Sequence, residues 1–134
     1  MGKYKDLIVW QKSMDLVEEV YNTVKALPSE EKYALSDQMR RAAVSIPSNI
    51  AEGQERISAR DFAKFLYYAK GSKSELETQF MICIRLNYLT QEQAEAAQNM
   101  LSEIGKMLNS LIRKLSLRPK LPSHHYPKQL PTSN

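Results

Sequence analysis

Five basic side chains have types and spacing that could hold a phosphate backbone. Arg56, Arg60 and Lys64 recur every four residues, so they form one stripe if the helical register extends back to residue 56. Arg40 and Arg41 lie together in a preceding helical segment. Contacts between cations and phosphates give binding that is independent of base sequence and weakens with salt. A solvated helix surface is the competing interpretation, because acidic residues lie among these cations, and the sequence leaves both open.

The sequence lacks the side chains with which helical bundles perform catalysis. His124 and His125 both follow the last helical segment, so the bundle itself has no imidazole for a di-iron or zinc site. Cys83 lies on an apolar helix face without a histidine to activate it, and we expect a small buried hydrophobe. The single glycines of AEGQER and KGSKSE do not make a glycine-rich phosphate loop. These absences predict a protein that is not an enzyme and holds neither metal nor cofactor.

The net charge of +4 is concentrated at the C-terminus of the 134-residue chain. Arg118, Lys120 and Lys128 lie in the last 18 residues, which contain no acid and four of the six prolines. The remaining chain has 16 basic and 15 acidic residues, so a basic surface there must arise from segregation of charge. We divide the chain into a four-helix domain, residues 1–116, and a basic proline-rich tail, residues 117–134, predicted to be disordered.

The sequence carries no signal for export or for membrane insertion. No apolar run approaches the ~18 residues that a membrane span needs, and the N-terminus has no apolar signal region. A single cysteine cannot form an internal disulfide, which fits a reducing compartment. We therefore expect a cytoplasmic protein without a membrane partner.

Four segments with helical periodicity must position these side chains, and no segment shows the alternation of a strand. In the first, an apolar seam comprises Leu7, Trp10, Met14, Val17, Tyr21 and Val24, and a second row beside it comprises Val9, Leu16, Val20 and Leu27. The second segment begins at Ser29 or, alternatively, at Ser36. Ser58 caps the third, and Thr90 with Gln93 forms a capping box for the fourth. The short links predict an all-α, antiparallel up-down four-helix bundle.

The first segment has more apolar surface than one core requires, since a bundle helix needs about one apolar stripe. Trp10, Leu16, Val20 and Tyr21 cannot all face the same core. We therefore predict that these four side chains contribute to contacts between the subunits of a homo-oligomer.

Two backbone features interrupt the helical segments. Pro47 offers no N–H to the carbonyl of Ala43, at a cost of roughly 3 kcal/mol, so we expect a kinked second helix. Asn49 could bond to backbone that the kink frees. The kink serves either packing or the presentation of the neighbouring arginines, and both remain open. Gly71 lies within the third segment at a cost of about 1 kcal/mol, for which a close helix crossing is the usual compensation.

Three stretches carry a resemblance to a known family: VWQKSMDLVEEVY, SDQMRRAAVSIPSNIAEG and FLYYAKGSKSELETQ. Together they resemble the bacterial four-helix-bundle family named for intervening sequences in 23S ribosomal RNA genes, over roughly residues 7 to 115. The resemblance implies an up-down bundle that assembles as a ring-shaped homopentamer. It also implies kinship with the accessory variability protein of diversity-generating retroelements, which binds a reverse transcriptase and nucleic acid. The basic tail is not part of the family pattern.

Two functions of different classes follow from these observations. The first is a non-enzymatic oligomeric module associated with nucleic acid, which binds ribosomal or other RNA, or DNA, through the backbone. The alternative is a structural adaptor ring that binds a protein partner and has no direct nucleic-acid role. Affinity for RNA that falls steeply with salt would distinguish the first from the second.

Overall fold

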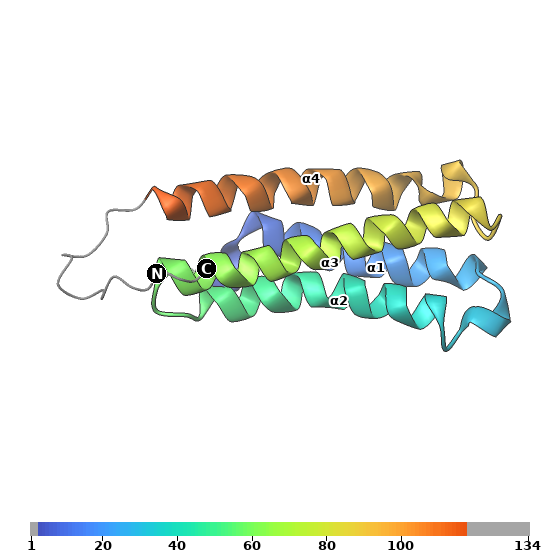
Figure 1. Ribbon diagram of the computed structural model, residues 1–134, viewed down its shortest axis with the longest axis horizontal. Helices are drawn as coiled ribbons and strands as arrows, with labels where there is room; N and C mark the ends of the chain where they lie inside the picture. The colour runs from blue at the N-terminus through green and yellow to red at the C-terminus, as the bar shows by residue number, and fades with distance from the viewer. Residues whose placement is uncertain (1–2, 118–134) are drawn as a thin grey trace, which may run out of the picture.

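Four α-helices account for most of residues 3–117, the part of the chain that our computed structural model describes (Figure 1). The helices are α1 (Ile8–Thr23), α2 (Leu35–Gln54), α3 (Ala59–Arg85) and α4 (Gln91–Ser116). Three 3-10 turns, η1 (Tyr4–Asp6), η2 (Val24–Ala26) and η3 (Ser29–Glu31), precede α1 and link it to α2. Residues 3–117 contain no strand, which confirms the prediction of an all-helical bundle.

The predicted tail, apart from Leu117, lies outside the described residues, and so do its histidines and its three basic residues. Within residues 3–117, no helix is both long enough and apolar enough to cross a membrane.

The predicted starts of α3 and α4 are confirmed. The Ser58 hydroxyl accepts a hydrogen bond from the Asp61 amide at 3.0 Å. Thr90 Oγ1 accepts from the Gln93 amide at 3.0 Å, and the Thr90 amide donates to Gln93 Oε1 at 2.8 Å. These reciprocal bonds satisfy amides that the first helical turn leaves without partners.

Each helix packs against two others, in the order α1, α2, α3, α4 and back to α1. Residues 55–58 join α2 to α3 at one end of the bundle, and residues 86–90 join α3 to α4 at the opposite end (Figure 1). The end at which α2 stops and α3 begins, here called the α2–α3 end, is also where α4 stops. Cross-helix contacts therefore connect residues far apart in the sequence.

Two such contacts mark the middle of the bundle. The hydroxyl oxygens of Ser45 on α2 and Ser72 on α3 are 2.8 Å apart. Lys12 Nζ on α1 lies 3.2 Å from Glu103 Oε2 on α4. Positions 45, 72 and 103 lie near the midpoints of α2, α3 and α4, and Lys12 of α1 lies beside position 103. These positions divide each helix into a half near the α2–α3 end and a half far from it.

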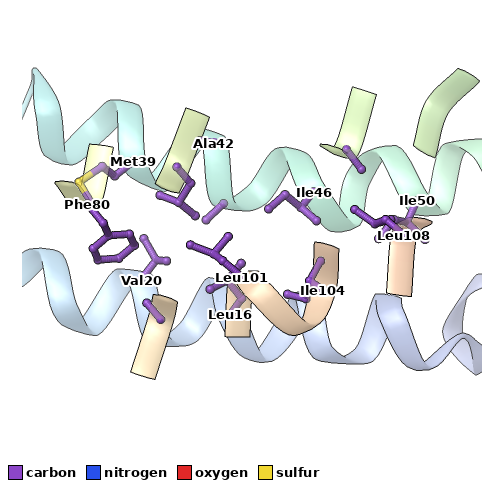
Figure 2. Close-up of a cluster of buried hydrophobic side chains, with 14 of the residues drawn as sticks. Leu16, Val20, Met39, Ala42, Ile46, Ile50, Phe80, Leu101, Ile104 and Leu108 are labelled. Atoms are coloured by element: carbon purple, nitrogen blue, oxygen red, sulfur yellow. The ribbon is translucent and has the colours of Figure 1, made fainter. Parts of the chain in front are cut away.

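A continuous core of apolar side chains fills the space between the helices. Figure 2 shows α1, α2, α3 and α4 all contributing to it. Its largest completely buried members are Leu16, Val20, Met39, Ile46, Ile50, Leu66, Leu76, Phe80, Cys83, Leu101, Ile104 and Leu108. Burial of this apolar surface is the main favourable contribution to folding.

The row of α1 that faces the core is not the predicted seam. Val9, Ser13 and Leu16 are buried, whereas Met14 and Tyr21 of the predicted seam are 41% and 44% exposed. The physical reason is Ser13, which interrupts the buried row with a polar residue in the sequence. Its hydroxyl donates to the Val9 carbonyl at 2.7 Å, so the serine is satisfied inside the core.

Because the second row of α1 faces the core, two of the four predicted subunit contacts are wrong. Leu16 and Val20 are 0% exposed within their own bundle, so neither side chain has surface for a second subunit. Trp10 is half-buried, with its ring 5.4 Å from that of Tyr4 in an edge contact. Tyr21 retains an exposed face on α1.

Helix α2 begins at Leu35, between its two predicted starts, and continues through Pro47. Pro47 therefore does not end the helix, and the kink itself stays a prediction. The Asn49 amide does not replace the hydrogen bond that the Ala43 carbonyl loses. It donates instead to the Ser45 carbonyl at 2.8 Å and to the Ser45 hydroxyl at 2.9 Å, which corrects the predicted role of Asn49.

The glycine that permits close helix packing is Gly53 rather than Gly71. A Cβ atom at residue 53 would lie 2.8 Å from Phe65 Cβ on the adjacent helix, closer than such atoms approach in proteins. A Cβ at residue 71 would meet no heavy atom within 4 Å. The close crossing expected at Gly71 is therefore absent from the described part of the protein.

Candidate nucleic-acid interface

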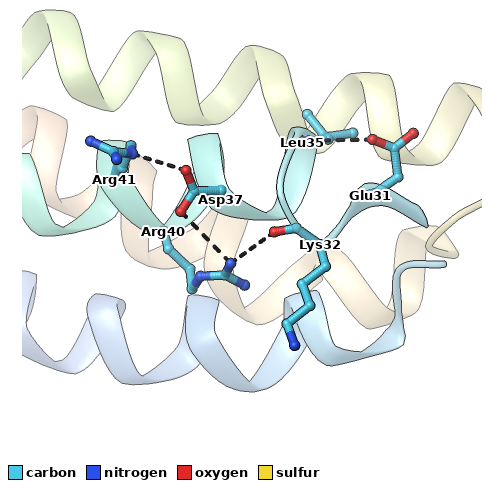
Figure 3. A network of polar contacts seen from close by, with 6 residues as sticks. All are labelled: Glu31, Lys32, Leu35, Asp37, Arg40 and Arg41. Carbon is cyan, nitrogen blue, oxygen red and sulfur yellow. Dashed lines mark hydrogen bonds and ion pairs between the residues drawn. The ribbon is translucent and has the colours of Figure 1, made fainter. Parts of the chain in front are cut away.

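Arg40 and Arg41 are each held by neighbouring protein groups (Figure 3). Arg40 Nη2 donates to the Lys32 carbonyl at 3.0 Å and lies 3.8 Å from Asp37 Oδ1. The guanidinium of Arg40 is also 5.9 Å from the centroid of the Tyr21 ring. Arg41 Nε donates to Asp37 Oδ2 at 2.9 Å, although its side chain is 79% exposed. Arg40 thus links α2 to α1 and to the preceding turn, and Asp37 offsets the charge of this pair.

Arg40 and Arg41 lie well away from the other three predicted cations. Arg41 belongs to the half of α2 far from the α2–α3 end, whereas Arg56 follows the last turn of that helix. Fifteen residues separate these two arginines, which is about 22 Å at the helical rise of about 1.5 Å per residue. The five predicted residues therefore do not form one surface on a single bundle.

Arg56 does not extend the α3 stripe as the spacing predicts. Glu55 caps the end of α2 and α3 begins at Ala59, so residue 56 lies in the link and outside the α3 register. The Arg56 guanidinium instead lies 4.5 Å from the centroid of the Phe65 ring and donates to Glu52 Oε2 at 2.7 Å. Lys64 Nζ lies 5.8 Å from the same Phe65 ring. The Phe65 ring thus brings Arg56 close to Lys64, although the two residues do not belong to one helical stripe.

Arg60 and Lys64 are the least neutralised of the predicted residues. They lie one helical turn apart on α3, and both are exposed. Neither has a carboxylate within 4.0 Å among residues 3–117. These two cations are free to contact a phosphate without breaking an ion pair.

Charge is segregated between the two halves of the bundle, although the body as a whole is nearly neutral. The half near the α2–α3 end, residues 3–11, 46–71 and 104–117, has nine basic and four acidic residues, a net charge of +5. The other half, residues 13–44 and 73–102, has six basic and ten acidic residues, a net charge of −4. Since like charges at one end add to its potential, the electrostatic potential of this end is more positive than that of the other.

Several cations at this end were not predicted as site residues. Lys106, Arg113 and Lys114 come from the second half of α4, and Lys3 and Lys5 from the segment before α1. Neither the group of three cations from α4 nor the two lysines before α1 stands out in the sequence as a cluster of charge. The short links predict which helix ends lie together in an up-down bundle. Counting the charged residues at each end of that predicted bundle would have identified these cations.

The thiol of Cys83 lies in an environment that does not activate it as a nucleophile. Cys83 is completely buried, and its thiol donates to Met39 Sδ at 3.6 Å. Burial, and secondly the charge of Glu31, raises the pKa of the Cys83 thiol to about 11. Because the thiolate is the reactive form, this environment suppresses reactivity.

The remaining chemical features are a part-buried hydrogen bond of a tyrosine to a carboxylate and the distribution of possible metal-binding side chains. Glu31 Oε2 accepts from the Tyr88 hydroxyl at 2.8 Å, and this bond raises the pKa of Tyr88. Residues 3–117 contain no group of three or more His, Cys, Asp or Glu side chains arranged to hold a metal ion.

Comparisons with known proteins find a family and a similar solved structure. The family model described as 23S rRNA-intervening sequence protein matches residues 5–110. A crystal structure from Bacteroides thetaiotaomicron VPI-5482, described as a protein with unknown function from the S23 ribosomal protein family, has a similar fold, with a TM-score of 0.73. That protein is 34% identical, and the match covers 79% of this chain and 99% of the other. Comparison with curated proteins gives no match.

Proposed function

We propose a function for this chain, which belongs to the 23S rRNA-intervening sequence protein family. The family model covers residues 5–110 and therefore nearly all of the bundle. The proposed function is that of a non-enzymatic, oligomeric module that binds RNA or DNA through the phosphate backbone. The excess of positive charge at the α2–α3 end is the observation that supports it most strongly.

Phosphate binding at this end requires no recognition of individual bases. Arg60 and Lys64 supply cations without a carboxylate partner among the described residues. Arg56, which is paired with Glu52, shares the Phe65 ring with Lys64. Contacts of this kind position a protein on a nucleic acid without specifying its sequence. We therefore expect similar affinities for RNA and DNA of unrelated sequence.

Assembly into an antiparallel-bundle ring would multiply this charge. In a cyclic ring whose bundles run along the symmetry axis, every α2–α3 end lies on the same face. A homopentamer, the state implied by the family resemblance, would then present five basic ends together. Exposed apolar side chains of Met14, Tyr21 and Val44, on α1 and α2, provide surface for contacts between subunits.

The direct test is binding of labelled RNA and DNA by the full chain, measured by fluorescence anisotropy between about 50 mM and 200 mM salt. We expect affinity that falls steeply with salt and differs little between RNA and DNA. A second protein with Arg118, Lys120 and Lys128 changed to Gln separates the tail from the bundle. Retained binding supports the α2–α3 end, and abolished binding assigns the phosphate contacts to the tail.

Light scattering tests the assembly independently. A mass near five times 15.4 kDa supports the pentamer, and a monomer at micromolar concentration rejects the ring.

A protein-binding adaptor ring is the second candidate function. A groove between α1 and α2 favours it, since apolar and charged side chains line the groove together. These are Tyr21, Asp37, Arg40, Arg41, Val44 and Ser45. Absence of nucleic-acid binding at low salt would support the adaptor instead, together with a protein that co-purifies with the full chain and is released by Arg41→Glu without a change in oligomeric mass.

A further inference from the structure

Two adjacent tyrosines on α3 are exposed and unexplained by packing. Tyr67 and Tyr68 are 57% and 51% exposed, although tyrosine is a residue of intermediate burial in folded proteins. The Tyr68 ring has an edge contact with Phe65, with 5.4 Å between ring centroids. Lys70 Nζ lies 5.5 Å from the centroid of the Tyr67 ring. Both tyrosines thus lie among cationic side chains, with large parts of their rings open to solvent.

The surrounding segment of α3 is cationic. Residues 62–74 contain three lysines and no acid, but Lys73 is paired with Glu77 at 3.0 Å, which leaves Lys64 and Lys70 without a carboxylate partner among the described residues. Arg60 lies about two turns before the tyrosines. Lys64 lies one helical turn before Tyr67 and Tyr68, in the (i, i+3) and (i, i+4) positions that share a helix surface. Asp61 and Glu75 carry the nearest negative charges on α3 and flank this segment. Aromatic rings interleaved with cations are the composition of surfaces that bind unpaired nucleotides.

Gly71 adds an independent observation at the same place. It follows Tyr67 by four residues and Tyr68 by three, so it lies on the same side of α3 one turn further on. A glycine inside a helix lowers its stability by about 1 kcal/mol relative to alanine. No part of the bundle approaches this position within 4 Å of a Cβ, so packing in the bundle does not explain the glycine. An absent side chain lets an external group approach the helix backbone closely.

We propose that this face of α3, formed by Arg60, Lys64, Tyr67, Tyr68 and Gly71, binds single-stranded nucleic acid. Unpaired bases stack on Tyr67 and Tyr68, phosphates contact Arg60 and Lys64, and the strand passes over Gly71. The proposal rests on the proposed function and names its substrate class. It predicts a preference for unpaired strands that the net charge of the α2–α3 end alone does not produce.

The physical basis for that preference is access to the faces of the bases. In a duplex, neighbouring base pairs already cover each face, so only phosphates and groove edges remain for a protein. In a single strand, a base can leave its neighbours and stack on an aromatic ring whatever its identity. Exposed tyrosines also occur at protein–protein contacts. The cations around them and the lack of acid across residues 62–74 favour a polyanion over a protein surface.

The test compares a single-stranded oligonucleotide with a duplex of the same length, using the full chain and fluorescence anisotropy over a range of salt. The key variant is Tyr67→Ala/Tyr68→Ala, and Tyr67→Phe/Tyr68→Phe retains the rings. Tyr33→Ala is the control, because this tyrosine is 85% exposed, lies beside a lysine with Lys32 Nζ 5.4 Å from its ring centroid, and belongs to the turn before α2. Light scattering of every variant shows whether its oligomeric state is retained.

We expect the wild-type chain to bind the single strand more tightly than the duplex. The alanine variant should bind the single strand roughly 5- to 150-fold more weakly for each tyrosine that carries a base. Its duplex affinity and the slope of affinity against salt should not change, and the phenylalanine variant should bind nearly as tightly as the wild type. Gly71→Ala should also weaken single-strand binding without unfolding the protein, since a Cβ there has room in the bundle.

Other results overturn the proposal and identify which part fails. Salt-dependent binding that is equal for single strand and duplex, and unaffected by Tyr67→Ala/Tyr68→Ala, retains the proposed function and rejects the stacking surface. A smaller oligomer for the alanine variant assigns the tyrosines to subunit contacts instead. No binding of either nucleic acid by the wild-type chain rejects the proposed function, and the stacking surface with it.

Discussion

The Arg56 guanidinium lies 4.5 Å from the centroid of the Phe65 ring, across the link between α2 and α3. Lys64 Nζ is 5.8 Å from the same ring, so Phe65 holds together one cation from the link and one from the helix. A cation over an aromatic face at an exposed site contributes about 0.5–1 kcal/mol. This interaction therefore positions part of the basic end and also stabilises the turn that forms it.

The stability of this turn can be tested at Arg56. Arg56→Ala should lower the free energy of unfolding by about 0.5–1 kcal/mol, because no cation from the link then lies over the Phe65 ring. Glu52→Gln removes only the exposed ion pair with Arg56 and should change stability by less than about 0.5 kcal/mol. Urea unfolding measures both. Equal decreases for the two variants would show that the ion pair, not the ring, holds Arg56.

Alanine substitutions at Gly71 and Gly53 should change the free energy of unfolding in opposite directions. Gly71→Ala should raise the free energy of unfolding by about 1 kcal/mol, since the new methyl group meets nothing and alanine favours the helix. Gly53→Ala should lower it by about 1–3 kcal/mol, since its Cβ would overlap Phe65 and force α2 and α3 apart. Thermal or urea unfolding distinguishes them. A stabilising Gly53→Ala would contradict the close α2–α3 contact.

The assignment of the α1 core row predicts unequal effects of two neighbouring substitutions. Leu16→Ala should lower the free energy of unfolding by about 2–5 kcal/mol, because it leaves a cavity among completely buried side chains. Met14→Ala, at a position 41% exposed, should cost under about 1 kcal/mol. A larger decrease for Met14→Ala would mean that the row predicted from periodicity faces the core after all.

Periodicity and capping residues were enough to predict the four helices and the starts of α3 and α4, and the family was predicted from the resemblance of three sequence stretches. They did not identify the inner face of α1, because the core there accepts Ser13 through a bond to its own helix backbone. They placed Arg56 in the α3 stripe only on the condition that the helical register extends back to residue 56, and the Ser58 cap starts α3 at Ala59 instead. The basic end was missed for a different reason. Its charges come from separate segments, which count as one group only when the ends of the helices are paired as the bundle pairs them.

Stability should depend on Cys83 at alkaline pH. The pKa of this buried thiol is raised from an ordinary value of 9.0 to about 11 in the folded protein, mainly by burial. The unfolded chain therefore releases its proton first as pH rises. The contribution of the neutral thiol is fully present below pH 9.0 and is lost as pH rises through about 11.

The measurement compares unfolding free energy against pH for the wild type and Cys83→Ala. The wild type should lose stability relative to the variant across this window. A constant difference between the two proteins would show that the folded and unfolded thiols titrate alike.

The most direct test of the account is a pair of charge reversals that change net charge equally at opposite ends of the bundle. Arg60→Glu/Lys64→Glu alters the α2–α3 end, and Lys25→Glu/Arg85→Glu alters exposed residues in the other half. None of the four has a carboxylate within 4.0 Å among the described residues, so no ion pair is broken. The quantity to measure is the slope of log affinity against log salt for a labelled single-stranded RNA. We predict that the first variant binds more weakly, with a slope smaller by about 0.7 for each phosphate that a subunit no longer neutralises, whereas the second retains the wild-type slope. Equal effects of the two variants, or no effect of either, would contradict a phosphate-binding site at the α2–α3 end.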